Sequence, residues 1–248
     1  MDPRGYRDQD RSALASAWPH EDERVELLVV IAAFNGVARL ALVLGVPSEI
    51  PAPLLRFEAG RRGAIGLLAR LAGFSMDLGE KAVPGLQPEA ALAALDDLLL
   101  AGIGFSQVPP GLSRLAACPE ILSTQLRLLR TAAAVLPRDR WARVGLVVSR
   151  LVGCEAFACE CAGLLRSRGE DPSEAIAASE GAASGLGETE LASIRFARDF
   201  TLHAHTLTRE RLREMRRAGL SDGAILDLAY VCAVFNGFAR LVIALAPV

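Results

Sequence analysis

The sequence predicts an all-α fold, and three observations support this prediction. Hydrophobic residues make up 52% of the 248 residues and aromatic residues only 5%, so Ala, Leu and Val must build the core, a composition typical of helices. Apolar residues recur at helical spacing in most segments, and no alternating segment of strand length stands out. Several of these segments open with Pro followed by Glu, or stop at Gly.

These start and stop signals divide the chain into nine expected helices. The segment 60–74 contains three interior glycines and is the weakest of them. The segment after Thr208, with a glutamate in its first turn and Gly219 at its end, has a clear start and stop. The expected helices are 27–46, 60–74, 88–100, 119–136, 139–153, 154–168, 191–200, 208–218 and 222–245.

Charge and composition exclude several classes of function. The formal net charge is −2 and the pI is about 6.0, so bulk electrostatics recruits the chain neither to nucleic acid nor to an anionic membrane. The first ten residues are too charged for a signal peptide, and five cysteines without secretory context indicate a reducing cytoplasm. The apolar stretches 27–46 and 226–248 each carry an Asn and an Arg near the middle, so we expect buried helices of a soluble core rather than membrane spans.

The same two stretches contain an internal repeat. Residues 34–40 (FNGVARL) match residues 235–241 (FNGFARL) at a constant offset of 201. The repeat indicates two copies of one helical element, one near each end of the chain. Within each copy the Asn and the Arg lie four residues apart and share a helix face. We expect them to hold the helix to its neighbours by hydrogen bonds rather than to bind a ligand.

Three of the five cysteines lie within eight positions, at Cys154, Cys159 and Cys161. On a helix, Cys154, Phe157 and Cys161 share one face, whereas Cys159 points elsewhere. Two in-register cysteines without a nearby histidine are too few for a metal site, so no metal is expected. Buried cysteines that act as small apolar residues remain an alternative. The His203–Ala204–His205 stretch is interpreted as a solvated connector rather than a pair of metal ligands.

Residues 100–248 resemble the AhpD-like / carboxymuconolactone decarboxylase superfamily. The resemblance implies an all-α bundle with a small pocket that forms dimers, trimers or hexamers. It also implies a partial repeat at 1–50, connecting helices at 51–99 and a complete unit at 100–248. The segments that carry it are Phe105-Ser106-Gln107-Val108-Pro109, the Leu115/Ala116/Pro119 segment, the Leu136-Pro137-Arg138 turn, the cysteine helix ending at Gly169, the 212–222 run (ending Ala-Gly-Leu-Ser-Asp) and the last helix with its FNGFARL motif.

The peroxidase branch of this family uses a Glu and a Cys-x-x-Cys-x-x-x-His motif, in which a lowered thiol pKa and a proton relay drive the chemistry. Carried over residue by residue, Cys154 takes the place of the first cysteine and Phe157 that of the second, peroxide-attacking cysteine. Cys161 stands in the place of the histidine, and Ala142 in that of the glutamate. Three of the four positions are therefore changed. The neighbouring carboxylates of Glu155 and Glu160 are expected to point away from the cysteine face.

Three functional hypotheses follow from this pattern. The first, slightly preferred, is a protein that keeps the family pocket, lined by Phe157 and Ala142, and binds or acts on a small organic molecule with Cys154 or Cys161 as the reactive group. The second is a non-catalytic homo-oligomeric relative. The third is a weak thiol-dependent hydroperoxide reductase that uses Cys154 with Cys161. None of them calls for a cofactor, nucleic acid or a membrane, and a homo-oligomer is expected throughout.

Overall fold

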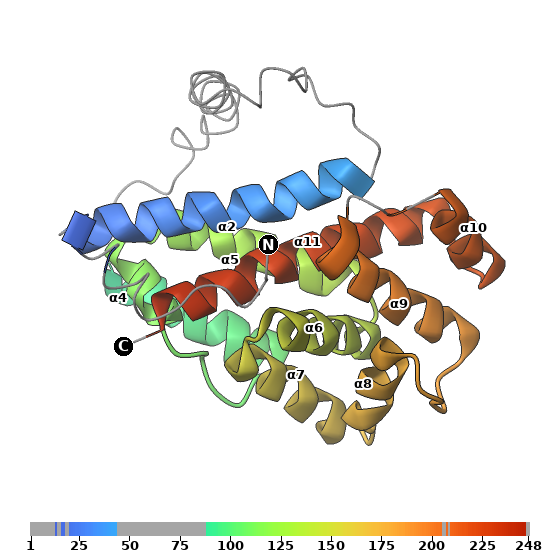
Figure 1. The fold of residues 1–248 in the computed structure, drawn as a ribbon. Helices are drawn as coiled ribbons and strands as arrows, with labels where there is room; N and C mark the ends of the chain where they lie inside the picture. Colours follow the sequence, from blue (N-terminus) through green and yellow to red (C-terminus); the bar gives the residue numbers. More distant parts are fainter. Residues whose placement is uncertain are drawn as a thin grey trace, which may run out of the picture.

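The computed structural model describes residues 13, 16–17, 20–43, 88–204, 207 and 209–246. Within these residues every regular element is a helix and none is a strand, which confirms the all-α prediction (Figure 1). The elements are α2 (Glu21–Val43), α4 (Pro88–Asp96), the π-helix η3 (Asp97–Ile103), the 3₁₀-helix η4 (Leu112–Ala117), α5 (Pro119–Val135), α6 (Arg138–Val152), α7 (Glu155–Ser167), α8 (Pro172–Glu180), α9 (Glu188–His203), α10 (Arg209–Arg217) and α11 (Asp222–Leu245).

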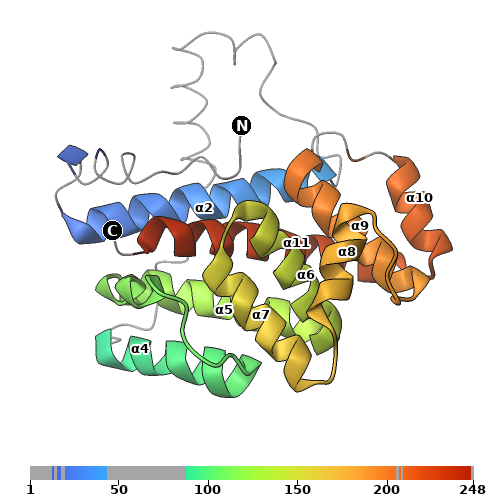
Figure 2. The same ribbon diagram turned by 60° about the horizontal axis from the view of Figure 1, so that its bottom comes forward.

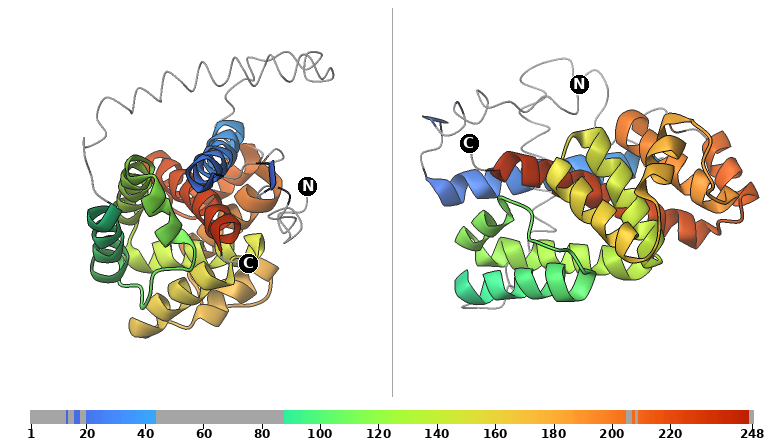
Figure 3. Two further views of the ribbon diagram at one scale, coloured as in Figure 1. Left: turned by 90° about the vertical axis from the view of Figure 1, so that its left-hand side faces the viewer. Right: turned by 90° about the horizontal axis from the view of Figure 1, so that it is seen from below.

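Helix α11 is the central element of the fold. It packs against α2, α5, α6 and α9, and Figures 1 and 3 show it running through the middle of the molecule. Ser221 caps its N-terminus by accepting a hydrogen bond from the backbone N–H of Ala224. Burial on several sides explains why this helix is apolar almost all round. Among the described helices, α11 alone is long and apolar enough to cross a membrane, but 67% of its apolar window is buried inside the fold.

Helix α2 lies antiparallel to α11, so the two copies of the repeat form one helix pair (Figure 2). A Cβ atom at Gly36 would lie 2.7 Å from the carbonyl oxygen of Ala233. A Cβ atom at Gly237 would lie 3.2 Å from the carbonyl oxygen of Ala32. A side chain at Gly36 would therefore force the backbones apart, and one at Gly237 would require the backbone at Ala32 to shift by a few tenths of an ångström. The two distant copies of the repeat are therefore in direct contact.

Helices α4 and α5 pack beside each other on another side of α11. The helix expected over 88–100 begins at Pro88 as predicted, but its last part is the π-helix η3 and continues to Ile103. Gly104, at a φ of 96°, ends it in the left-handed region. The domain boundary expected between residues 99 and 100 falls within η3; the division into domains stays a prediction.

Helices α6 to α10 form the remaining part of the described fold. Gly153, at a φ of 87°, joins α6 to α7. Helix α8 was not expected, although its signals are present: the Asp171 side chain accepts from the Ser173 N–H at 2.9 Å, and Pro172 opens the helix. Helix α9 is longer than expected, since it begins at Glu188 and reaches His203. The expected helix 60–74 and the residues Thr208 and His205 lie outside the described residues.

Candidate functional site

Cys154 and two residues of α7, Phe157 and Cys161, are buried inside the protein. Cys154 precedes the first turn of α7 and is 2% exposed, whereas Phe157 and Cys161 are fully buried. Cys159 is exposed on another side of the same helix. All five cysteines are free thiols. The face inferred from the helical spacing therefore exists, and it points into the core.

Helix α6 packs against the buried face that carries Phe157 and Cys161. A Cβ atom at Gly145 would lie 2.4 Å from Cζ of Phe235 and 2.8 Å from Sγ of Cys161. Because Gly145 has no side chain, α6, α7 and α11 can pack closely at this point. Ala142, the other predicted pocket residue, lies on the same helix and is fully buried.

Four aromatic rings fill the space beside the cysteines. Phe157 meets Phe105 edge-on with ring centroids 5.3 Å apart, and it meets Phe235 in the same manner at 5.6 Å. Trp141 lies 4.7 Å from Phe235 and 6.2 Å from Phe105, measured between ring centroids. These are ordinary contact distances for packed aromatic pairs. Phe157 is thus one member of an aromatic cluster in which each ring contacts two others, formed by Phe105, Trp141, Phe157 and Phe235.

Burial controls the chemistry of both thiols. Burial raises the pKa of Cys154 from 9.0 to about 11, and the negative charge of Glu155 adds to the shift. Burial also raises the pKa of Cys161 well above its usual range, with further contributions from Cys154 and Glu160. Both groups are therefore protonated thiols at neutral pH, and a thiol is a poor nucleophile compared with a thiolate.

The nearby carboxylates are engaged elsewhere. Glu160 is 4% exposed and accepts hydrogen bonds from the Ser106 N–H at 2.6 Å and from its hydroxyl group at 2.8 Å. It thereby holds the loop after η3 against α7. Glu155 lies 3.6 Å from Arg150 in an exposed ion pair. Both carboxylates therefore have partners other than the two thiols.

Two buried polar atoms of α6 have no hydrogen-bond partner among the described residues. They are Nε1 of Trp141 and the hydroxyl oxygen of Ser149. Trp141 belongs to the aromatic cluster, and Ser149 is fully buried. A buried polar group without a partner costs roughly 1–3 kcal/mol.

A cluster of charges at the start of α6 was not recognised in the sequence. Arg143 is 7% exposed and contacts Asp139 at 3.3 Å, Glu190 at 3.2 Å and Glu170. These carboxylates come from α6 itself, from the start of α9 and from the turn before α8. Arg140 adds a second contact to Glu190 at 2.6 Å. The cluster joins three elements, and its members are too far apart in sequence for any local pattern to reveal it.

The Asn and Arg residues of the repeat hold helices together, as expected. Arg39 donates from Nε to Oδ1 of Asn35 at 2.9 Å and from Nη1 to the carbonyl oxygens of Phe200 and Thr201. Asn236 donates from Nδ2 to the hydroxyl oxygen of Thr201 at 3.0 Å. A cation at these carbonyl groups also complements the negative end of the α9 dipole. Both copies of the motif thus bind the last turns of α9.

The described part of the chain contains no group of three or more His, Cys, Asp or Glu side chains placed to hold a metal ion. His203 ends α9 and is exposed, while its expected companion His205 is outside the described residues. No family model, curated protein or solved structure matches the chain. The resemblance to the AhpD-like superfamily therefore stays a prediction.

Proposed function

We propose that this chain is a non-catalytic, self-associating helical protein, a relative of the AhpD-like superfamily that has lost the peroxidase relay. The single observation that supports this proposal most is the sealed face of α7. There, two protonated thiols and Phe157 are packed against α6 and α11. A thiol peroxidase needs a thiolate that peroxide can reach, and this arrangement disfavours both requirements. Of the three hypotheses, the packing favours the non-catalytic homo-oligomer.

The small-molecule hypothesis loses support for the same reason. Phe157 would have to border a pocket, but two of its neighbours are aromatic rings at contact distance. Phe235 and Cys161 both lie within 3 Å of the place that a Cβ atom of Gly145 would occupy, so no space is left there. A small organic ligand would therefore have to displace the aromatic cluster before it could reach either thiol.

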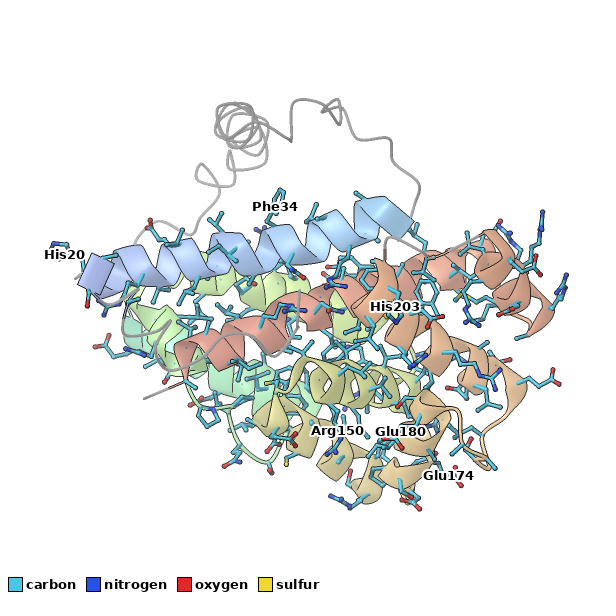
Figure 4. The ribbon with its side chains drawn as sticks, in the orientation of Figure 1. His20, Phe34, Arg150, Glu174, Glu180 and His203 are labelled. Carbon is cyan, nitrogen blue, oxygen red and sulfur yellow. The ribbon has the colours of Figure 1, made fainter. Side chains whose placement is uncertain are left out.

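An exposed apolar surface on α2 supports self-association. Val30, Ile31, Phe34 and Val37 are 51%, 56%, 52% and 63% exposed, and their spacing places them along one side of the helix. In Figure 4 the Phe34 side chain points away from α11. We call these four residues the outer stripe. Apolar patches of this kind mark interaction sites, but four side chains offer less than the ~800 Å² per partner of a stable dimer. The association through this surface is therefore weak and depends on concentration.

The absence of thiol chemistry is directly testable. We expect purified protein supplied with a dithiol to consume hydroperoxide no faster than its Cys154→Ser and Cys161→Ser variants. A thiol-reactive probe at neutral pH should label Cys159 quickly and leave Cys154 and Cys161 unlabelled until the protein is unfolded. Loss of peroxidase activity in either variant would contradict the proposal.

The raised pKa of Cys154 also predicts how the stability of the fold depends on pH. The folded state holds this proton more tightly than the unfolded state, in which the pKa is near 9.0. The contribution of this group to stability is therefore complete below pH 9.0 and is lost as the pH rises through about 11. Cys154→Ser should flatten the alkaline loss of stability, measured by denaturant unfolding at a series of pH values.

Self-association through the outer stripe predicts a second result. Phe34→Glu places a charge at the centre of the stripe, so the weight-average mass measured by sedimentation should fall toward that of one chain. Cys159→Glu adds the same charge to an exposed position on α7 and should leave the mass unchanged. If the wild-type protein associates and the Phe34→Glu variant has the same mass, the outer stripe is not the contact.

A further inference from the structure

The contact between α2 and α11 has the form of a two-fold symmetric interface. Gly36 of α2 approaches the backbone of Ala233 in α11, and Gly237 of α11 approaches the backbone of Ala32 in α2. Ala32 and Ala233 are equivalent in the repeat, and so are Gly36 and Gly237, at the same offset of 201. Each helix therefore offers an alanine to the glycine of the other. This reciprocity is the mark of an isologous interface between two copies of one surface.

The sequences on the C-terminal side of the contact are nearly the same as well, whereas residues 25–33 and 226–234 match more loosely. Residues 34–40 and 235–241 differ only where Val37 stands in place of Phe238. A helix face that packs on a near copy of itself is complementary to itself. The face of α11 that α2 now covers is consequently suited to the α11 of a second chain, with Gly237 on the backbone of the partner's Ala233 and the reverse.

The polar residues at the contact provide an independent observation. In α2, Oδ1 of Asn35 accepts a hydrogen bond from Arg39. In α11, the equivalent Asn236 is fully buried, and its Oδ1 accepts no hydrogen bond among the described residues. Burial, together with the positive charge of Arg39, lowers the pKa of Arg240. In this arrangement, the residue of α11 next to Gly237 therefore carries a buried acceptor without a hydrogen bond from any described residue.

We propose that α11 carries a two-fold pairing surface for a second copy of this chain, centred on Ala233 and Gly237, and that α2 covers this surface from within the same chain. Because α2 belongs to the same chain, its contact with α11 is intramolecular and is favoured over contact with a second chain. Release of α2 exposes the surface. The inference concerns the inner side of α2 and is independent of the outer stripe.

The test uses the full-length chain with Phe34→Glu as background, so that the outer stripe makes no contribution to the mass. Gly36→Leu places a side chain against the carbonyl oxygen of Ala233 and should displace α2. We expect the mass measured by sedimentation to double relative to the background. Gly163→Leu is the matched control, because a Cβ atom at this glycine of α7 has nothing within 4 Å, and its mass should not change.

A double substitution identifies the surface that forms the dimer. Adding Gly237→Leu to Gly36→Leu leaves α2 displaced but blocks the pairing of α11 with α11, so the mass should return to that of the background. Persistence of the doubled mass would mean that another surface is used and would overturn the proposal. A Gly36→Leu chain that keeps the background mass would overturn it equally.

Circular dichroism establishes whether the Gly36→Leu chain is still folded. If it is unfolded, Gly36→Ala replaces it, with hydrogen exchange over residues 21–43 as a measure of α2 release. Faster exchange together with a concentration-dependent rise in mass supports the proposal. Faster exchange at constant mass contradicts it, and so does unchanged exchange, because the close contact at Gly36 would then be absent.

Discussion

Replacing Phe235 with alanine should lower the free energy of unfolding by about 3–5 kcal/mol. Phe235 is fully buried and contacts two rings of the aromatic cluster, at centroid distances of 4.7 Å to Trp141 and 5.6 Å to Phe157. Its removal takes away apolar contacts from α6 and α7 together and leaves a cavity at the place where three helices meet. Denaturant titration followed by circular dichroism gives the measurement, with a constant slope required for the comparison.

The repeat supplies a matched control for this substitution. Phe34 occupies the equivalent position in α2, in the same Phe-Asn-Gly context, but is 52% exposed. Phe34→Ala should therefore cost about 1 kcal/mol or less at concentrations where the chain is monomeric. Equal losses for the two variants would mean that Phe34 is covered in solution as Phe235 is. Equally small losses would mean that the aromatic cluster does not hold the core together.

Local sequence signals predict most of the described helices. The helix expected over 222–245 has those same ends in the structure, because Ser221 and the residues after it form a strong N-terminal signal. The helix α8 shows the opposite case: its Asp-Pro start and Gly181 stop were present, but the segment is only nine residues long and has little helical periodicity. The π-helix η3 has no sequence signal of its own, and its form depends on packing.

Local sequence patterns predict only part of the candidate site. Helical spacing correctly placed Cys154, Phe157 and Cys161 on one face, since that follows from the geometry of a single helix. It could not show what covers the face. Phe105 precedes that face by about fifty residues and Phe235 follows it by more than seventy, so their meeting with Phe157 depends on the tertiary fold. Whether the face forms a pocket or a packed core therefore depends on residues that are distant in sequence.

The substitution Arg143→Met should lower the free energy of unfolding by roughly 2–4 kcal/mol. Arg143 is almost fully buried and is surrounded by the carboxylates of Asp139, Glu170 and Glu190. Methionine keeps much of the side-chain volume but removes the charge, so three carboxylates near one another lose their shared cation. The partners retain some exposure to water, which keeps the expected loss below that of a fully buried pair.

Two further variants separate charge pairing from packing. Arg150→Met removes an arginine of the same helix whose partner Glu155 is 3.6 Å away and exposed, and it should change stability by no more than about 0.5 kcal/mol. Glu170→Gln combined with Arg143→Met completes a double-mutant cycle, for which we expect a coupling of about 0.5–3 kcal/mol. A coupling near zero would show that the pair of Arg143 and Glu170 contributes no electrostatic attraction. The loss in Arg143→Met would then come from packing or from the pairs with Asp139 and Glu190.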